Sequence, residues 1–539
     1  MKYNNITLAV IAASSLFAAS CSKVDDFLNE DPSKATARPV ETVEQLDAVL
    51  ASYAFYPVNY FEEMPDMLYA SDDFRIDPTV QLVKNRGYNN FVLNYGLWNS
   101  ENTVGDRYST WNSEYKKVYY ANLCLDNVDK VSGSEEAKAV VRADAHFMRA
   151  YSFFQIALAH TLYYDGKNGD ELGISLKSSI NFEEPIKRSS LAETWDFIDK
   201  DLQEALKCTK PFVTSEQPVR NWRASTVGVR SFAARYYLYR NDMANAKKYA
   251  QMVLEEYSEM KNLNNPKDMA FGSSSSWKYF LQDNGKLDSV LVRYPNTRQQ
   301  LVTYFEMEPN MNALLGWKGL TYAKAIMEPT SATLLSEDLI NTYKTDVPGG
   351  VLTNDLRYNF FVIQGYGLTV STEGSASRNQ PVSKKSLYPS YVNFLGDLLS
   401  GTTTAEMYLI LAECAAREGL AQKAMEYVNI VRKNRIASAA YTDLTATDAA
   451  DALKKVLQER RREMPFSIRW YDMKRLNAYD PANSVTVTRK FYPYTSTSVN
   501  INDELITYTL EPCSRHYAIP ISSTEIANSK NIIEQNIYE

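Results

Sequence analysis

The sequence predicts a mainly α-helical protein in which pairs of helices form a scaffold, and long irregular segments with a little β structure run between the pairs. Three observations support this prediction. Apolar residues recur at spacings of three and four in several stretches, which is the period of one helix face. Two of these stretches break at a short turn and then resume as a second helix. Between the helical stretches lie segments rich in Asn, Pro, Gly, Ser and Tyr that are too long to be simple connections.

Residues 1–20 have the layout of a secretory signal peptide. A charged start at Lys2 is followed by a short apolar core that ends at Ala19, and the small residue Ser20 precedes Cys21. The core is shorter than the roughly 20 apolar residues that a membrane-spanning helix needs. The run Ala-Ala-Ser-Cys resembles a bacterial lipobox, in which the cysteine is acylated and becomes the new N-terminus. We predict lipidation of Cys21; the alternative is an ordinary signal peptide, with Cys21 incidental.

The residues behind Cys21 indicate where such a lipoprotein would go. The short acidic run Ser22–Asp26 resembles the tag that sends some Gram-negative lipoproteins to the outer face of the outer membrane. Several acyl chains would hold the protein on that membrane without a transmembrane segment. We therefore expect a lipid-anchored outer-membrane protein that faces the cell exterior.

Composition and motifs exclude several classes of function. The formal charge is −7 and basic runs are absent, which argues against a nucleic-acid partner. Beyond Cys21 there are four scattered cysteines with no CxxC pair, so we expect most of them to be buried thiols and none to form a zinc site. EF-hand spacing, HExxH, GxSxG and a phosphate-binding glycine loop are all missing from the sequence. We expect no catalytic site, no metal and no cofactor.

The helical periodicity is clearest in four stretches. Residues 135–162 carry one long apolar face, and residues 226–239 carry a second. Residues 406–417 and 448–462 repeat the pattern, and the last of these leads into Trp470. The tail after Ser484 alternates like a β-strand. We expect helical pairs near 139–208, 225–256 and 404–435.

Two of these pairs resemble tetratricopeptide repeats. In residues 225–256 and 404–435, small alanines stand where two helices would press together. Such units bury their faces by stacking on neighbours. Because the two are far apart in the sequence, they do not form a continuous solenoid. Ordinary helical hairpins remain the alternative interpretation.

Three segments, near residues 57–110, 257–330 and 345–403, show no sustained period. Long loops on a rigid scaffold are where binding sites usually lie. We expect these loops to form the ligand side of the molecule. No clean boundary appears after residue 40, so we predict one domain over residues 21–539.

Six segments, in order along the chain, resemble the SusD/RagB family. Residues 459–466 and 469–475, which read ERRREMPF and RWYDMKR, are similar to two parts of the arginine-rich signature of that family. The opening CSKVDDFLNEDPSKAT, the helix TWNSEYKKVYYANLCLDNV, the segment RADAHFMRAYSFFQI and the end HYAIPISSTEIANSKNIIEQNIYE match it as well. Pro465 and the stretch SKNIIEQNIYE, which lacks the usual prolines, are departures from the family pattern.

The resemblance implies a binding protein. Members are outer-membrane lipoproteins, largely helical, with tetratricopeptide pairs, and they cover a TonB-dependent barrel of the SusC type. They capture nutrients for import, usually oligosaccharides. The helical pairs are expected to face the barrel and the loops to bind the glycan. A peptide or other nutrient as ligand, and a surface glycan-degrading enzyme, are the alternatives.

Loop aromatics are the candidates for glycan contact, because sugar C–H faces stack on flat rings while hydroxyls bind nearby polar groups. Each could equally be a packing residue. Trp111, Trp195, Trp222 and Trp470 are assigned to packing instead. The candidate ligand-binding residues are Trp98, Trp277, Tyr279, Tyr294, Trp317 and Tyr322.

Charged and titratable groups receive structural interpretations. Asp72, Asp73 and Asp77 could supply the two carboxylates of a glycosidase, but solvated loop charges are the favoured interpretation. The signature arginines are expected to pin the C-terminal helices by ion pairs and not to form a sugar-acid site. His146 and His160 are expected in the core or at a helix interface.

Overall fold

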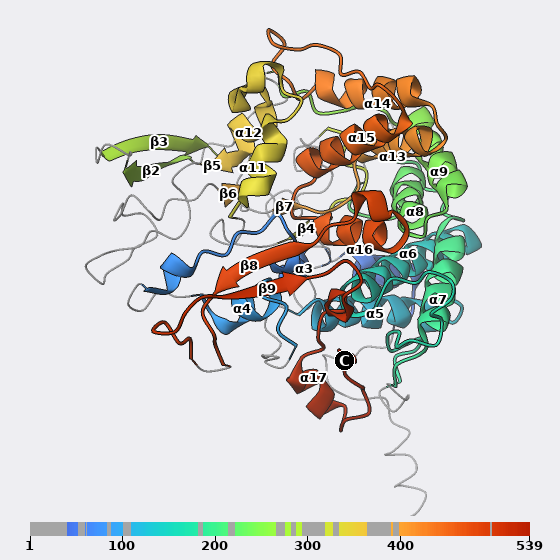
Figure 1. The fold of residues 1–539 in the computed structure, drawn as a ribbon. Helices are drawn as coiled ribbons and strands as arrows, with labels where there is room; N and C mark the ends of the chain where they lie inside the picture. Colours follow the sequence, from blue (N-terminus) through green and yellow to red (C-terminus); the bar gives the residue numbers. More distant parts are fainter. Residues whose placement is uncertain are drawn as a thin grey trace, which may run out of the picture.

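The protein is described here from a computed structural model of the full chain. The described residues are 40–51, 60, 62–82, 88–100, 109–181, 187–213, 221–265, 275–281, 287–293, 318–326, 334–363, 390–391, 398–495 and 498–538. Figure 1 shows helices gathered on one side of the molecule and short strands, loops and small helices on the other.

The helical side confirms the prediction of a mainly α protein. Its helices are α5 (Thr110–Asn127), α6 (Glu135–His160), α7 (Leu191–Ala205), α8 (Thr226–Tyr239), α9 (Met243–Glu256), α13 (Thr404–Arg417), α14 (Ala421–Lys433), α15 (Ala449–Glu463) and α16 (Arg469–Tyr479). Successive helices pack as pairs, notably α5 with α6, α8 with α9 and α13 with α14. Among the described residues, no helix is both long and apolar enough to cross a membrane.

The two tetratricopeptide-like pairs are neighbours in space although they are distant in sequence. Helix α9 packs against α13, and the two pairs share one buried cluster (Figure 1). The small side chains of Ala246 and Ala250 on α9 let the backbones approach, and Ile410 and Cys414 on α13 fill the contact. The stacking buries apolar faces that neither pair could bury alone.

Helix α6 lies at the centre of the main core. Phe147, Tyr151 and Phe154 meet Phe232 of α8 at ring-centroid distances of 5.2–5.9 Å. Edge-to-face contacts of this kind add to the free energy gained by burying the rings. The indoles assigned to packing are buried as expected: Trp111, Trp195, Trp222 and Trp470.

Side-chain caps define where the scaffold helices begin. Ser190 and Glu193 form a capping box at the start of α7, with Ser190 Oγ accepting from the Glu193 N–H. Ser225, Asp242 and Thr403 cap α8, α9 and α13 in the same way through one side-chain oxygen each. Each of these short polar residues therefore fixes the N-terminal end of its helix.

A three-stranded sheet joins the three segments that separate the helical pairs. Strand β4 (Ala325–Ile326) pairs in parallel with β1 (Glu62–Glu63) and antiparallel with β7 (Leu398–Leu399). The expected loop regions 57–110, 257–330 and 345–403 therefore meet at one place.

These segments are not irregular throughout, which corrects the sequence interpretation. Strands β2 (Ser275–Leu281) and β3 (Leu287–Arg293) form a seven-pair antiparallel hairpin. Shorter pairs join β5 (Val362–Ile363) to β6 (Ser390–Tyr391) and β8 (Val487–Phe491) to β9 (Ile506–Leu510). Cross-strand bonding supplies regular structure here that a 3.6-residue period cannot reveal.

Short helices complete the loop side and the two ends of the described chain. They are α2 (Val43–Ala51), α3 (Asp66–Ala70), α4 (Asn90–Gly96), α11 (Glu337–Lys344), α12 (Leu356–Phe361) and α17 (Ser523–Asn528), with 3₁₀ turns η1 (Pro78–Leu82), η3 (Pro348–Gly350), η4 (Leu352–Asn354), η5 (Pro481–Asn483) and η6 (Arg515–Tyr517). Apolar residues of α3, α4, α11 and α12 share a second core with Phe466 and Phe491.

The arginine-rich signature of α15 and α16 is a buried ion-pair network, as predicted. Arg460 pairs with Glu406 of α13 and Asp472 of α16 at 3.1 and 2.8 Å. Arg475 pairs with Glu413 of α13 at 2.7 Å, so both helices are fastened to α13. Breaking such a buried pair leaves an uncompensated charge and costs several kcal/mol.

Candidate functional site

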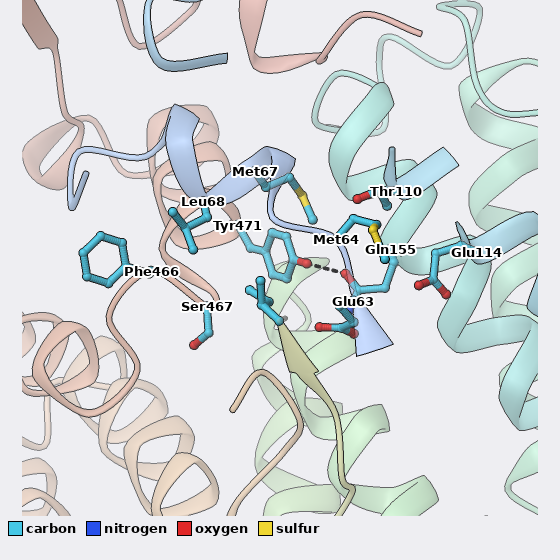
Figure 2. Close-up of a pocket in the computed structure, with 11 residues that line it drawn as sticks. Glu63, Met64, Met67, Leu68, Thr110, Glu114, Gln155, Phe466, Ser467 and Tyr471 are labelled. Atoms are coloured by element: carbon cyan, nitrogen blue, oxygen red, sulfur yellow. Dashed lines mark hydrogen bonds between the residues drawn. The ribbon is translucent and has the colours of Figure 1, made fainter. Parts of the chain in front are cut away.

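A small pocket lies where the three loop-bearing segments return to the helical scaffold. Glu63 ends β1, Ile326 ends β4 and Thr110 begins α5, so each lies within two residues of a segment outside the described residues. Figure 2 shows side chains of α3, α6 and the turn before α16 pointing toward the same space. The lining residues are Glu63, Met64, Met67, Leu68, Thr110, Glu114, Gln155, Ile326, Phe466, Ser467 and Tyr471.

A chain of hydrogen bonds crosses the pocket. The Tyr471 hydroxyl donates to Gln155 Oε1, the bond drawn in Figure 2. The Gln155 amide donates to Glu63 Oε1 at 2.8 Å, and the Tyr151 hydroxyl donates to the same oxygen at 2.7 Å. The network joins α16, α6 and β1 through groups that are all buried. Partnered polar groups of this kind hold a buried site in one geometry.

Buried cations balance the carboxylates of the pocket. Lys117 Nζ lies 2.5 Å from Glu114 Oε1, and the second Glu114 oxygen has no hydrogen-bond partner in the described part of the chain. Lys324, just before Ile326, donates to the Tyr60 carbonyl and lies 5.1 Å from the Tyr151 ring. Burial, together with repulsion from Lys117, lowers the pKa of Lys324 to about 7.

Asp66 secures the start of α5 from within α3. Its carboxylate accepts from the Thr110 N–H at 2.9 Å and the Thr110 hydroxyl at 2.5 Å. Burial raises the pKa of Asp66 to about 6, against the opposing effect of these bonds. The carboxyl group therefore takes up a proton at mildly acidic pH more readily than an exposed aspartate does.

The pocket is too small for a sugar ring. Its cavity of about 10 Å³ has room for roughly one water molecule. Acceptor oxygens of Glu63 and Glu114 and the hydroxyl of Tyr471 offer such a water its bonds. The pocket is therefore a small polar cavity at the base of the loop-bearing segments and is not a ligand cavity.

Two of the predicted ligand aromatics lie in the packed interior. Trp98 is 8% exposed, donates from its indole to the Ala70 carbonyl at 3.0 Å, and has the Arg489 guanidinium 4.8 Å from its ring. Tyr322 is 3% exposed and packs on Phe147. Neither ring presents an open face to solvent, so their place in the fold favours the packing interpretation, and ligand contact by these two stays a prediction.

The other predicted sites are not brought together by the described residues. Trp277 and Tyr279 belong to β2, opposite Leu291 and Ser289, but their side chains lie outside the described part. Residues 1–39, which include the predicted signal peptide, also lie outside the described residues. Outside the described residues lie Cys21, Tyr294 and Trp317.

The acidic pair Asp72–Asp73 is buried, which corrects its interpretation as a solvated loop charge. Arg469 binds both oxygens of Asp72 at 2.7 Å, and Arg461 donates to Asp73 at 2.7 Å. Burial opposes ionisation of Asp72, but the guanidiniums of Arg461 and Arg469 hold its pKa below the usual range. These carboxylates form part of the ion-pair network that secures the loops to α15 and α16.

The Asp73 carboxylate also shapes the wall of the pocket. It accepts from the Phe466 N–H at 2.7 Å, and Phe466 has a positive φ of 62°. That conformation is costly for a bulky residue, so the bond and the surrounding packing must hold it. Pro465, a departure from the family pattern, lies directly before this turn and after the end of α15.

Histidines and cysteines behave as predicted where the structure describes them. His160 is buried beside Trp111, and burial lowers its pKa to about 3. His146 lies 2.7 Å from Asp201 at the α6–α7 interface. Cys124, Cys208 and Cys414 are buried free thiols, and Cys513 is exposed. No cluster of three or more potential metal ligands occurs among the described residues.

Sequence reasoning did not find Glu63, Gln155 or Thr110 as pocket residues. Glu63 stands in a two-residue strand, and nothing in its local sequence distinguishes it from other surface-type carboxylates. Gln155 sits on an otherwise apolar helix face, which is the one signal that could have marked it. Tyr471 lies inside the signature that was recognised.

Comparisons with known proteins agree with this architecture. A family described as "starch-binding associating with outer membrane" matches residues 26–238, and the SusD family matches residues 404–538. A SusD-like protein of Formosa agariphila is 30% identical over 164 residues, which span 29% of this chain and 30% of that relative. The aligned region is therefore under a third of the relative's length.

Solved structures extend the similarity along the whole chain. A SusD superfamily protein from Bacteroides thetaiotaomicron superposes with a TM-score of 0.61 at 16% identity, covering 92% of this chain and 100% of that one. A laminarin-binding SusD-like protein gives 0.55 at 14% identity, covering 92% and 99%. These structures show a shared fold, and the family models, which together match more than half of the chain, show that it belongs to the SusD/RagB family.

Proposed function

We propose that this protein is a cell-surface lipoprotein that binds an oligosaccharide or polysaccharide and delivers it to a SusC-like TonB-dependent transporter in the outer membrane. The observation that carries the proposal is family membership combined with a fold shared over nearly the whole chain. A laminarin-binding protein among the structural neighbours supports a glycan as the class of ligand. Lipidation at Cys21 would supply the anchor.

The arrangement of the chain supports a binding role on the loop side. The sheet β1–β4–β7 joins the three long segments next to the small pocket. In that pocket Glu63, Gln155 and Tyr471 are linked by hydrogen bonds. Loops attached to such a rigid scaffold can differ in sequence without disturbing the core. Trp277, Tyr279, Tyr294 and Trp317 belong to one of these segments and are our proposed stacking residues there.

A non-catalytic role fits the charged groups near the loops. Asp72 and Asp73 are neutralised by Arg461 and Arg469, and neither carboxylate is free to act as a general acid or base. We infer capture without bond cleavage. The helical pairs, on the opposite side from the β2–β3 hairpin in Figure 1, are the proposed face for the barrel.

Glycan binding can be tested with the full-length protein in detergent. Affinity electrophoresis in laminarin, starch and xylan gels should show retardation by one glycan class, and calorimetry should give its affinity. Trp317→Ala should reduce binding roughly fivefold to a hundredfold, because one lost stacking ring is worth about 1–3 kcal/mol. Tyr441→Ala, on the helical side, is the matched control and should bind normally.

The outcomes separate the alternatives. Retardation without release of shorter sugars supports the capture role. Release of shorter sugars would contradict the non-enzyme proposal. No retardation by any glycan, together with binding of peptides, would favour peptide capture. Cys21→Ser should release the protein from membranes, and the wild type should co-purify with its barrel partner.

A further inference from the structure

A second hollow lies on the helical scaffold, away from the loop side. It is an open groove between α7 and α8 with a volume of about 450 Å³, within the range of small-molecule sites. Figure 1 places α7 and α8 on the opposite side of the molecule from the β2–β3 hairpin. The residues that matter to the argument are Tyr164, Trp195, Asp196, Asp199, Arg240 and Asp242.

Arg240 is held in this groove without a hydrogen-bond acceptor. Its guanidinium carbon lies 4.5 Å from the Tyr164 ring centroid and 5.0 Å from that of Trp195. Neither a carboxylate nor a carbonyl of the described residues accepts from its guanidinium, and its Nη1 is buried and unpartnered. The Trp195 indole N–H, in a side chain that is 2% exposed, is unpartnered as well. Leaving such donors unbonded costs about 1–3 kcal/mol each.

The two rings explain why the guanidinium stays in place. A cation that stacks on aromatic faces gains roughly 0.5–2 kcal/mol and loses its rotational freedom. Trp195 is itself fixed by stacking on Tyr239 at 5.4 Å. Arg240 is therefore a pre-oriented donor group, and a ligand would meet no cost for ordering it.

Three carboxylates line the same groove without pairing with Arg240. Asp196 pairs with Lys200 at 2.6 Å, and Asp199 accepts weakly from the Tyr237 hydroxyl at 3.4 Å. Asp242 caps α9 by accepting from Asn245 at 2.7 and 3.0 Å. Each oxygen can still accept a further bond from a ligand.

The mixed lining selects the chemical class of ligand. An anion would meet three carboxylates, and a basic side chain would meet the fixed Arg240 cation. A neutral polyol satisfies both, because each hydroxyl donates to a carboxylate and accepts from a guanidinium. No described cluster of carboxylates is placed to hold a metal ion.

We propose that the α7–α8 groove is a second carbohydrate-contact site, which holds a neutral sugar unit between Arg240 and the carboxylates of Asp199 and Asp242. The inference rests on the proposed function, since it assumes a glycan ligand. It adds a contact site on the helical scaffold to the one expected in the loops. Since the helical pairs are also the proposed barrel face, the groove is open to a glycan while that face is uncovered, and a glycan long enough to leave the loop side could then engage both sites.

Photo-crosslinking can locate the sites directly. Laminarihexaose, maltohexaose and xylohexaose, each with a diazirine at the reducing end, are irradiated with the full-length protein, and the crosslinked peptides are mapped by mass spectrometry. We expect crosslinks both in residues 191–205 or 236–242 and in the loop segments. Arg240→Ala should lower groove crosslinks at least tenfold and leave loop crosslinks unchanged.

The controls keep the test decisive. Arg230→Ala removes the same charge from α8, the helix that Arg240 follows; Arg230 pairs with Glu256 outside the groove, and its loss should change neither set of crosslinks. Thermal melting must be unaltered in both variants. Asp199→Asn should reproduce the groove effect with a smaller change in charge.

Each remaining outcome contradicts the inference. Crosslinks confined to the loops would leave glycan binding intact and remove the second site. Equal loss at both places in Arg240→Ala with unchanged melting would show that the groove is not a separate site. Displacement of groove crosslinks by hexalysine but not by free hexasaccharide would assign the groove to a basic peptide. No crosslinks anywhere, with no glycan retardation, would overturn the proposed function too.

Discussion

The small pocket and the groove between α7 and α8 are both polar hollows bordered by aromatic rings. They differ in whether their polar groups are hydrogen-bonded to one another. In the pocket, Glu63, Gln155 and Tyr471 bind one another, and the remaining space has room for about one water molecule. In the groove, Arg240 is aimed between two rings and binds no acceptor of the described chain. Space for a ligand exists only in the second case.

The paired groups of the pocket suit a structural role, and the unpaired Arg240 of the groove suits ligand binding. A closed network built from α3, α5, α6, α16 and two strands stabilises the fold, because removing one member leaves its buried partners unpaired. An open site that keeps oriented donors and acceptors unpaired gives up some stability for binding. Substitutions should therefore have large effects on stability in the pocket and small ones in the groove.

The largest expected effect is on the wall of the pocket. Asp73→Ala removes the acceptor of the Phe466 N–H and one carboxylate of buried Arg461. We expect a loss of about 3 kcal/mol in the free energy of unfolding, since the buried Phe466 N–H loses its acceptor and buried Arg461 keeps only Asp72 and Asp338 as partners. Urea unfolding measures it. A loss below about 1 kcal/mol would mean that the pocket wall is not held by this pair.

The second effect concerns pH and arises from buried lysines behind the pocket. Burial lowers the pKa of Lys324 to about 7, and burial alone does the same to Lys474. From pH 7 to about 8.5 the unfolded chain keeps these protons while the folded chain releases them, so stability rises with pH. Each lysine contributes at most about 1.4 kcal/mol per pH unit.

Lys324→Met should reduce this slope, and the double variant with Lys474→Met should nearly abolish it in urea unfolding at pH 7.0 and 8.5. The rise ends near pH 9, because burial raises the pKa of the Cys124 and Cys414 thiols to about 12, and above pH 9 their effect on stability offsets that of the two lysines. The wild-type slope persisting in the double variant would place its source elsewhere.

A smaller effect is expected for Tyr471→Phe. The change removes only the hydroxyl that donates to Gln155 and leaves the ring in place. We expect a loss of about 1 kcal/mol in the free energy of unfolding. Tyr441→Phe, whose hydroxyl binds Asp443 at the surface, is the matched control and should cost a few tenths. Equal losses would mean that the pocket network adds no stability of its own.

The smallest effect on stability is expected in the groove. Arg240→Ala should change the free energy of unfolding by less than about 1 kcal/mol, because it breaks no ion pair and loses only its ring contacts. Urea unfolding beside Arg230→Ala checks this. A loss of 3 kcal/mol would make Arg240 a structural residue like those of the pocket and would remove the contrast between the two hollows.

The scaffold was predictable because its signals are local. The predicted helix over 226–239 matches α8 in both bounds, and the stretch 448–462 differs from α15 by one residue at each end. The β2–β3 hairpin was missed although Asn284-Gly285 stands between its strands, a pair typical of tight hairpin turns. The prediction for this segment rested on helical periodicity, which such a pair does not affect.

Long-range pairing was beyond local patterns. Asp72 and Asp73 stand almost four hundred residues before Arg469 and Phe466, so their sequence neighbourhood resembles that of solvated loop charges. Trp98 lies in a polar stretch, yet Arg489 and the Ala70 carbonyl enclose it. Both interpretations followed composition, which cannot show what the fold brings alongside.

The order of residues alone identifies the family, the helical pairs and the packing role of the signature arginines, because helix period, caps and a contiguous signature are properties of neighbouring residues. The stacking of α9 on α13, the pocket of Glu63, Gln155 and Tyr471, and the unpaired Arg240 come from folding. Each depends on contacts between segments distant in sequence, whose geometry is set by packing the whole core.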